Sequence, residues 1–356
     1  MPPPPQDNTD FSPGNALIAM SGGVDSSVAA ALMLDKGCPC EGLTLKLCGN
    51  DAEKSALNDA QNVAQKLGMP HHVLDFTEFF RKEVILPFIE TYEKGATPNP
   101  CIYCNHHIKF AFPLFRALKF DIYATGHYAQ TEKQGSRWFL KKAADHKKDQ
   151  SYVLFTLDQE TLSRTCFPLG SLTKNEVREI AESRGFINAN RKDSQDICFV
   201  PDGNYGTFIE QYTGKTYPPG DITDPAGKII GRHNGHIRYT LGQRRGLGVA
   251  MNEPVYVCSK NTLQNTITLG PESSLYSKNL SAHAINLIAC KTLEKGIRAT
   301  VKTRYLQKEH SAWVLQTGPD EIKVEFDEPQ RAITPGQAAV FYDGDIVVGG
   351  GIITGG

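Results

Sequence analysis

The sequence lacks the features that would mark a membrane, secreted or strongly basic protein. No apolar run among its 356 residues approaches the length of a membrane span, and the proline-rich start has no apolar core of a secretory signal. The formal net charge of −1 excludes nucleic-acid binding by a uniformly basic surface and leaves only local patches. Nine cysteines in this context favour a reducing, cytoplasmic setting, in which closely spaced thiols more often do chemistry than form disulfides.

The most informative segment is Ser21-Gly22-Gly23-Val24-Asp25-Ser26-Ser27. It stands between an apolar run at 16–20, typical of a buried strand, and an Ala/Leu-rich stretch at 28–34, typical of a helix. The two glycines let the backbone approach a ligand, and the amides of the first helical turn attract anions through the helix dipole. The Gly-Lys-Ser/Thr of a Walker loop is missing, so we predict a phosphate site of another type.

Hydrophobic patterns predict three domains behind a flexible tail at residues 1–13. Strand patterns at 41–47, 71–76 and 120–125 alternate with helix patterns, which predicts an α/β domain at 14–200. Its doubly wound parallel sheet would bind ligands at the carboxyl ends of the strands. Short runs interrupted by Gly, Pro, Asn and Asp predict a small mixed or β domain at 201–276. Alternating segments then predict an antiparallel β-barrel at 277–356.

Three cysteines form a second group of candidate functional residues. Cys101 and Cys104 follow Thr97-Pro98-Asn99-Pro100, and Cys198 lies far downstream after Asp193-Ser194-Gln195-Asp196-Ile197. The prolines favour an extended backbone just before a helix start, where the helix dipole would lower the pKa of a cysteine. Taken alone, Cys-x-x-Cys is ambiguous among zinc, redox and cluster chemistry, and Cys198 is compatible with a buried core thiol.

Together these motifs resemble the tRNA-specific 2-thiouridylases, a family of N-type ATP pyrophosphatases. The resemblance covers nearly the whole chain after residue 14, and its further motifs are Ala124–Tyr128, Lys148–Tyr152, Ile197–Phe199, Thr240–Arg244 and Arg304-Tyr305. It implies that ATP is cleaved between its α and β phosphates and that O2 of the wobble uridine, in the anticodon region of tRNA, is adenylated. Sulfur from a cysteine desulfurase or a sulfur-relay protein would then replace that oxygen.

The resemblance also implies roles for single residues. Cys104 would be the nucleophile, and Cys198 would receive the persulfide. One thiol could present the sulfur and the other could release it by disulfide formation. The ATP site would comprise Ala19, Met20, Ser21, Gly22, Gly23, Val24, Asp25, Ser26, Leu45 and Gly126. The target base would face Asn99, Pro100 and Cys101, and the tRNA would contact His127, Lys148, Asp149, Gln150, Arg304, Tyr305 and Gln337. The Asp25 carboxylate is also the type of hard oxygen ligand that Mg²⁺ prefers.

Cys101 departs from the family pattern, in which Asp is common at this position. One interpretation is persulfide relay; the other is that Cys101, Cys104 and Cys198 ligate a 4Fe–4S cluster whose open iron carries the sulfur. A third interpretation is that Cys101 is a neutral packing substitution.

Two other functions remain compatible with one motif each. The phosphate loop alone fits an ammonia-dependent or ligating ATP pyrophosphatase, and the cysteine pair alone fits an RNA-binding protein with a structural metal. Neither function accounts for both motifs.

Overall fold

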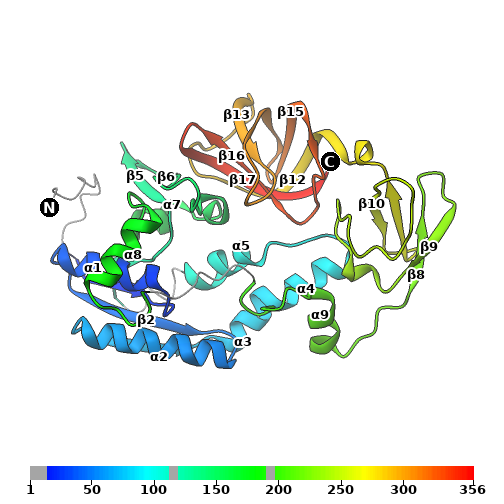
Figure 1. Cartoon of the computed structure of the whole chain (residues 1–356). Coiled ribbons are helices and arrows are strands. Elements are labelled where there is room, and N and C mark those ends of the chain that lie inside the picture. Colours follow the sequence, from blue (N-terminus) through cyan, green and yellow to red (C-terminus); the bar gives the residue numbers. More distant parts are fainter. Residues whose placement is uncertain (1–13, 112–118, 190–196) are drawn as a thin grey trace.

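The computed structural model describes residues 14–111, 119–189 and 197–356, which form three connected parts (Figure 1). The tail expected at 1–13 lies outside the described residues. No helix among the described residues is long and apolar enough to cross a membrane.

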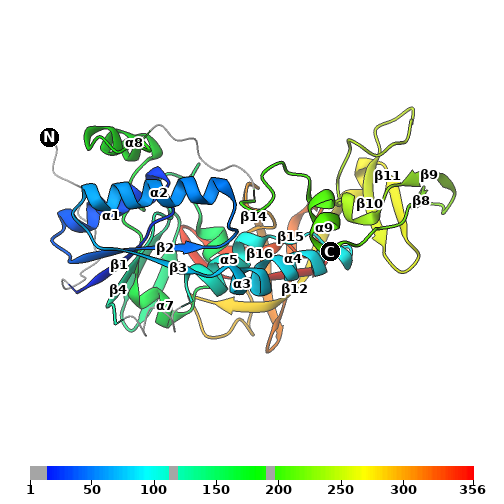
Figure 2. The ribbon, with the colours of Figure 1, turned by 90° about the horizontal axis from the view of Figure 1, so that it is seen from below.

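The first part is built on a parallel sheet of order β3-β2-β1-β4-β7. Its strands are β1 (Ala16–Ala19), β2 (Cys40–Lys46), β3 (His71–Asp75), β4 (Ile122–Ala124) and β7 (Thr165–Cys166). Helices α1 (Val24–Asp35), α2 (Asp51–Lys66) and α8 (Lys174–Ser183) share a hydrophobic core with one face of this sheet. Figure 2 shows α1 and α2 lying along that face. The predicted parallel α/β sheet is therefore confirmed.

The opposite face of the sheet packs against a segment of the barrel. Leu17 and Tyr123 of the sheet share one core with Tyr152 of η3 (Ser151–Leu154) and with Val340 of the C-terminal part. The buried Tyr152 hydroxyl donates to the Ala338 carbonyl at 2.9 Å and accepts from the Ala338 N–H at 3.2 Å. The barrel is therefore attached to the α/β part through a shared core, and the functional residues of the two parts can meet.

Helical segments follow β3 and lead to the cysteine pair. The helix pattern that follows the strand pattern at 71–76 is present as α3 (Thr77–Phe80), a π-helical turn η1 (Arg81–Ile85) and α4 (Leu86–Glu93). Next come α5 (Pro100–Cys104) and a second π-helical turn, η2 (Asn105–Lys109). Such turns inside helices are frequent at functional sites, because they displace one residue from the regular helical hydrogen bonds. Here the second π-helical turn begins directly after Cys104.

The central part carries a four-stranded sheet of order β10-β11-β8-β9. Its elements are α9 (Tyr205–Thr213), β8 (Gly220–Thr223), β9 (Ile229–His233), η4 (His236–Arg238), β10 (Tyr256–Asn261) and β11 (Thr266–Gly270). The short helix η5 (Glu272–Leu275) leads from this sheet to the barrel.

The C-terminal part is a closed antiparallel barrel, which confirms the predicted fold class. Its strands are β12 (Tyr276–Leu287), β13 (Ile297–Lys302), β14 (His310–Gly318), β15 (Glu321–Arg331), β16 (Ala338–Asp343) and β17 (Ile346–Gly355). β12 pairs with both β15 and β17, which closes the barrel. The hairpin of β5 (Gln130–Gln134) and β6 (Arg137–Lys141), followed in the chain by α7 (Gln159–Arg164), joins the barrel through the pair Lys141 and Ile346. The exact domain boundaries stay predictions.

Candidate active site

The phosphate loop connects β1 to α1 and has the close backbone packing that its glycines permit. Gly22 has a φ of +74°, and a Cβ there would lie 2.0 Å from the Ala56 carbonyl oxygen. A Cβ on Gly126, just beyond β4, would lie 2.7 Å from the backbone of Asp25 and Ser26. Larger side chains at either position would force the loop away from its neighbours. The Ser26 hydroxyl donates to the Gly23 carbonyl at 3.0 Å and thereby holds the loop closed.

The start of α1 is available to an anion. Its N-cap residue is Gly23, and no side chain caps it, so the N–H groups of the first turn keep donors free for a ligand. Two of the residues predicted for ATP lie near this point. Met20 directly follows β1 and donates its N–H to the Leu43 carbonyl at 2.8 Å, and Leu45 lies in β2. The sheet thus brings together the predicted residues that are far apart in sequence.

Asp25 faces a lysine that the sequence analysis did not identify. Its carboxylate oxygens accept from Lys174 Nζ at 2.7 and 2.8 Å, and one of them also accepts from the Tyr128 hydroxyl at 2.8 Å. The Lys174 side chain is only 8% exposed. The predicted Mg²⁺ role of Asp25 stays a prediction. A metal ion would have to share this carboxylate with Lys174. Lys174 directly follows Thr173, the N-cap residue of α8. Nothing in the sequence around Lys174 indicated that its side chain would reach Asp25.

Cys101 and Cys104 lie at the two ends of α5. Cys104 is buried, and this burial raises the pKa of its thiol to about 12. Cys101 reaches the surface, yet the surrounding chain still raises the pKa of its thiol. The expectation of a dipole-lowered pKa at this helix start is therefore wrong. The reason is that α5 has only five residues, and desolvation outweighs the dipole of so short a helix.

Cys198 is the acidic thiol of the group. It is exposed, and its pKa is lowered to about 7. The largest cause is hydrogen bonding to the Cys48 thiol, and the positive charge of Lys109 adds to it. Together these two effects outweigh desolvation, which raises the pKa. Lys109 lies in η2 and also favours the thiolate forms of Cys101 and Cys104. At neutral pH the thiolate is therefore concentrated on the residue that the resemblance implies as persulfide carrier.

Sequence reasoning missed Cys48, Lys109 and Glu53. Cys48 stands just beyond β2, and the Glu53 carboxylate accepts from the backbone N–H groups of Leu47, Cys48 and Gly49 at 2.6 to 3.3 Å. The signal that could have found Cys48 is its place at the carboxyl end of a parallel strand, the edge where ligands bind. The only sequence signal for Lys109 was its position five residues after Cys104.

The described cysteines do not form a ready cluster site. Three thiolates suit iron chemically, and Cys101, Cys104 and Cys198 are close enough to act on one another electrostatically. Yet within residues 14–111, 119–189 and 197–356 no group of three or more His, Cys, Asp or Glu side chains could hold a metal ion. All nine cysteines are free thiols. The arrangement therefore does not fit a 4Fe–4S cluster.

Two of the residues predicted to contact tRNA bring the barrel to the cysteine pair. Gln337 donates its side-chain amide to the Thr97 carbonyl at 2.9 Å, and the Thr97 N–H donates to Pro335 at 2.9 Å. Burial raises the pKa of the Tyr305 hydroxyl to about 12, with a smaller contribution from Cys101. The barrel therefore lies directly against the loop that the resemblance implies as the target-base contact.

The other residues predicted to contact tRNA have structural partners in this chain. His127 is buried and hydrogen-bonded to Thr125, and desolvation keeps its pKa well below the ordinary value. Asp149 is buried and accepts from the Ser151 hydroxyl at 2.8 Å. Arg304 donates to Thr334 at 2.7 Å and to the Ala332 carbonyl at 2.9 Å. Their contacts with tRNA, like those of Lys148 and Gln150, stay predictions.

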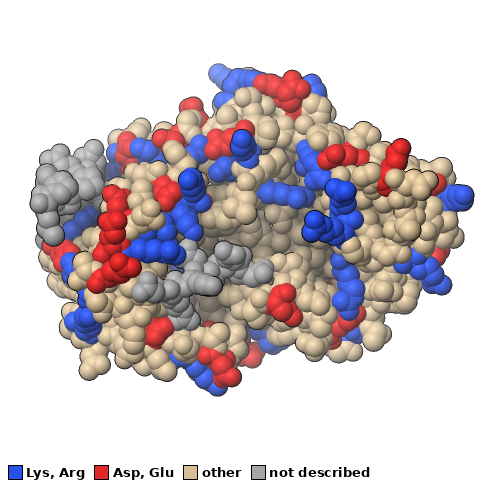
Figure 3. Space-filling model, in the orientation of Figure 1, with Lys and Arg blue, Asp and Glu red and all other residues tan. Residues whose placement is uncertain are grey.

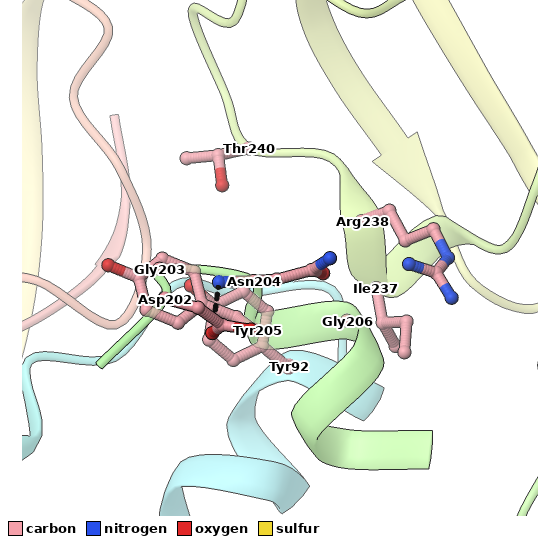
Figure 4. Close-up of a pocket in the computed structure, with 9 residues that line it drawn as sticks. All are labelled: Tyr92, Asp202, Gly203, Asn204, Tyr205, Gly206, Ile237, Arg238 and Thr240. Atoms are coloured by element: carbon pink, nitrogen blue, oxygen red, sulfur yellow. Dashed lines mark hydrogen bonds between the residues drawn. The ribbon is translucent and has the colours of Figure 1, made fainter. Parts of the chain in front are cut away.

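The surface around this region is hollowed. Figure 3 shows a depression between the barrel, the central part and the helices beneath, with Lys and Arg side chains along its margin. A separate hollow of about 240 Å³ lies between α4, α9 and η4, and its lining includes Tyr92, Asn204, Arg238 and Thr240 (Figure 4). It contains neither a thiol nor a residue of the phosphate loop, so we do not assign the reaction to it.

A parallel α/β domain with a non-Walker phosphate loop, joined to a small β sheet and a β-barrel, defines a multidomain α/β protein with a candidate phosphate-binding site. A family model described as a tRNA methyl transferase HUP domain matches residues 15–202. A model described as a tRNA methyl transferase PRC-barrel domain matches 206–271, and one described as an aminomethyltransferase beta-barrel domain matches 277–353.

Two curated relatives match over nearly the full length. The tRNA-specific 2-thiouridylase MnmA of Treponema denticola is 48% identical over 354 residues, which cover 95% of this chain and 97% of the relative. The protein of that name from Acetivibrio thermocellus is 45% identical over 358 residues, which cover 96% and 100%. The chain belongs to the family of tRNA-specific 2-thiouridylases.

Likeness to solved structures is lower. The U34-tRNA thiolase NcsA from Methanococcus maripaludis with its [4Fe-4S] cluster has a TM-score of 0.37 and 15% identity, over 57% of this chain and 68% of that chain. This likeness is too weak to carry the cluster over to the present chain.

Proposed function

We propose that this chain is an ATP-dependent tRNA uridine 2-sulfurtransferase that acts on the wobble uridine. One observation carries the proposal: the phosphate loop follows β1, and Cys48, whose thiol lowers the pKa of Cys198, follows the adjacent strand β2. Parallel neighbours place these two groups at one edge of the sheet. Adenylating and sulfur-transferring groups then face a single substrate base. Full-length similarity to the named 2-thiouridylases supports this assignment.

The first step is adenylation. Uracil O2 attacks the α phosphorus of ATP, the bond to the bridging oxygen breaks, and pyrophosphate leaves with the electron pair. The N–H groups at the start of α1 would bind the phosphates, and we propose Mg²⁺ as a counter-ion near Asp25. The missing Walker lysine and the loop glycines support cleavage to AMP and pyrophosphate rather than to ADP.

The second step is sulfur transfer. The terminal sulfur of a Cys198 persulfide attacks C2, the C2–O2 bond breaks, and AMP leaves with the oxygen, so that a disulfide links C2 to Cys198. A second thiol attacks the Cys198 sulfur, and 2-thiouridine departs with the electron pair. The resemblance implies Cys104 for this thiol. A pKa of Cys198 near 7 makes its sulfur a competent acceptor of sulfur at neutral pH.

The partners follow from this chemistry. A cysteine desulfurase or a sulfur-relay protein would load Cys198, which is exposed enough to be reached. The anticodon region of tRNA would enter the basic-rimmed hollow of Figure 3, with its target uridine turned out of the base stack. ATP, tRNA and reduced thiols would meet in the cytoplasm.

Reconstitution tests the proposal. The purified chain is incubated with ATP, Mg²⁺, unmodified tRNA and a persulfide donor, and tRNA nucleosides are analysed by mass spectrometry. We expect 2-thiouridine, AMP and pyrophosphate in equal amounts. ADP and phosphate as products would contradict the adenylation step. Pyrophosphate release with ammonia and a carboxylate substrate, but not with tRNA, would support an amidating enzyme instead.

A further inference from the structure

Asn188 contacts the phosphate loop from a segment that lies outside every motif named in the sequence. Its side-chain Nδ2 donates to the Gly22 carbonyl at 2.9 Å and to the Ser27 hydroxyl at 2.9 Å. The Ser27 hydroxyl in turn donates to the Gly23 carbonyl at 3.0 Å. One amide group therefore holds two consecutive peptide units of the loop, the first directly and the second through Ser27.

The position of Asn188 is itself fixed. It follows α8 in a turn in which the Ala189 N–H donates to the Phe186 carbonyl at 3.1 Å, and both of these residues belong to the core that α8 shares with the sheet. Asn188 is 3% exposed, and its Oδ1 has no hydrogen-bond partner among the described residues. An unpaired buried acceptor destabilises the fold, and an apolar side chain would avoid this cost. The two bonds to the loop are therefore what the amide group contributes at this position.

Holding these two carbonyls also fixes the N–H groups of the same peptide units. A trans peptide is planar, so its N–H points opposite to its C=O. The Gly22 carbonyl points to the buried Asn188, and the Gly23 N–H therefore points away from it, where its contact with the exposed Ser21 hydroxyl is a long 3.4 Å. The Gly23 carbonyl is held through Ser27, and this orients the N–H of the first residue of α1. Without these bonds the glycine peptides could turn over at small cost, because glycine accepts positive as well as negative φ.

We propose that Asn188 is a positioning residue of the ATP site. This inference rests on the proposed role of the loop in binding ATP phosphates. The Asn188 amide keeps the Gly23 and Val24 N–H groups directed at the phosphates, so that little reorganisation is needed when ATP binds. Lys174, at the opposite end of α8, holds Asp25. The helix and the turn that follows it therefore hold the loop at two points.

Steady-state kinetics separate positioning from stability. Asn188→Leu is a neutral change of similar size that removes both donors, and tRNA-dependent pyrophosphate release is measured against ATP and against tRNA. We expect the KM for ATP to rise about tenfold, as for the loss of one hydrogen bond to a charged group, while the KM for tRNA stays unchanged. A residue that only stabilises the fold would lower the fraction of folded enzyme, which reduces the apparent kcat and leaves both KM values in place. That second result would overturn the proposal.

Asn286 in β12 offers a matched control. Its Nδ2 also donates to two acceptors, the Phe155 carbonyl at 2.7 Å and the Leu157 carbonyl at 2.9 Å. Asn286→Leu should lower stability in urea unfolding without changing the KM for ATP. An equal rise of this KM in the Asn188 and Asn286 variants would contradict a positioning role.

A smaller change keeps the proposal testable if Asn188→Leu folds poorly. Ser27→Ala removes the link to the Gly23 carbonyl and leaves the direct bond from Asn188 to Gly22 in place. We expect the KM for ATP to rise by less than in Asn188→Leu. An unchanged KM in Ser27→Ala would count against the chain of bonds.

Hydrogen exchange tests the geometry without requiring ATP. The peptide covering residues 21–27 is followed by mass spectrometry in the full chain and in both leucine variants. Exchange should be at least about twofold faster in Asn188→Leu than in Asn286→Leu, because the loop then opens more often. Equal rates would refute the hold on the loop. If the unaltered chain does not bind ATP, the proposed function is wrong, and this comparison still decides whether Asn188 holds the loop.

Discussion

The acidity of Cys198 gives a direct quantitative prediction. A thiol with a pKa of about 7 is about half ionised at pH 7, whereas one at the reference value of 9.0 is only about 1% ionised. The Cys48 hydrogen bond is the largest cause of this lowering. Because the thiolate is the form that lies above the pKa, Cys48→Ala should move the ionisation midpoint upward and reduce the thiolate at pH 7. The reduction should be about tenfold, with an upper limit of about 50-fold.

Alkylation kinetics measure this directly. Iodoacetamide modification of the Cys198 peptide is followed from pH 5.5 to 9.5 by mass spectrometry. In the unaltered chain the rate should rise with pH and level off above about 7. Cys48→Ser keeps a hydroxyl donor and should retain most of the acidity, which separates hydrogen bonding from packing. The explanation fails if Cys48→Ala keeps the midpoint of the unaltered chain, or if Cys48→Ser and Cys48→Ala shift it equally.

Four further predictions concern the adenylation and sulfur-transfer groups. Asp25→Asn should abolish tRNA-dependent pyrophosphate release while circular dichroism shows an intact fold. Lys174→Met leaves the Asp25 carboxylate without its cation, so urea unfolding should show a loss of about 2 kcal/mol, discounted because Asp25 is partly exposed. Cys198→Ser should end 2-thiouridine formation while pyrophosphate release continues, and loss of both activities would show that the two steps share this residue. Anaerobically purified chain that is active in thiolation should contain no stoichiometric iron or acid-labile sulfide, whereas close to four irons, lost on mutation of Cys101, would establish a cluster.

The parts of the fold that sequence predicted well are those specified locally. The alternation of apolar runs located β1, β2 and β3, and the capping box that Thr173 and Glu176 form at the start of α8 is a similarly local pattern. Each pattern depends on residues a few positions apart, so neighbouring side chains already contain the information. The glycines of the phosphate loop were informative for the same reason, because the tight turn must be made by the residues within it.

The organisation of the thiols depends on contacts between distant segments. Cys48 and Cys198 are separated by 150 positions, and no periodicity relates a strand end to a loop that far downstream. The pKa of the thiol at the start of α5 was predicted in the wrong direction for Cys101, because the helix start is visible in sequence whereas the burial that raises this pKa is not. Lys109 influences three thiols from one position, which follows only from the π-helical turn that carries it.

The barrel contacts also limit how tRNA can bind. Gln337, assigned to tRNA by resemblance, here donates to the Thr97 carbonyl, so a contact with RNA through the same N–H has to replace that bond. The backbone bond from Thr97 to Pro335 does not involve the Gln337 side chain and can persist during the exchange. The loop can thus stay attached to the barrel while the side chain turns to the substrate. Because Cys101 contributes to the raised pKa of Tyr305, a rearrangement of Tyr305 would change the electrostatic surroundings of Cys101.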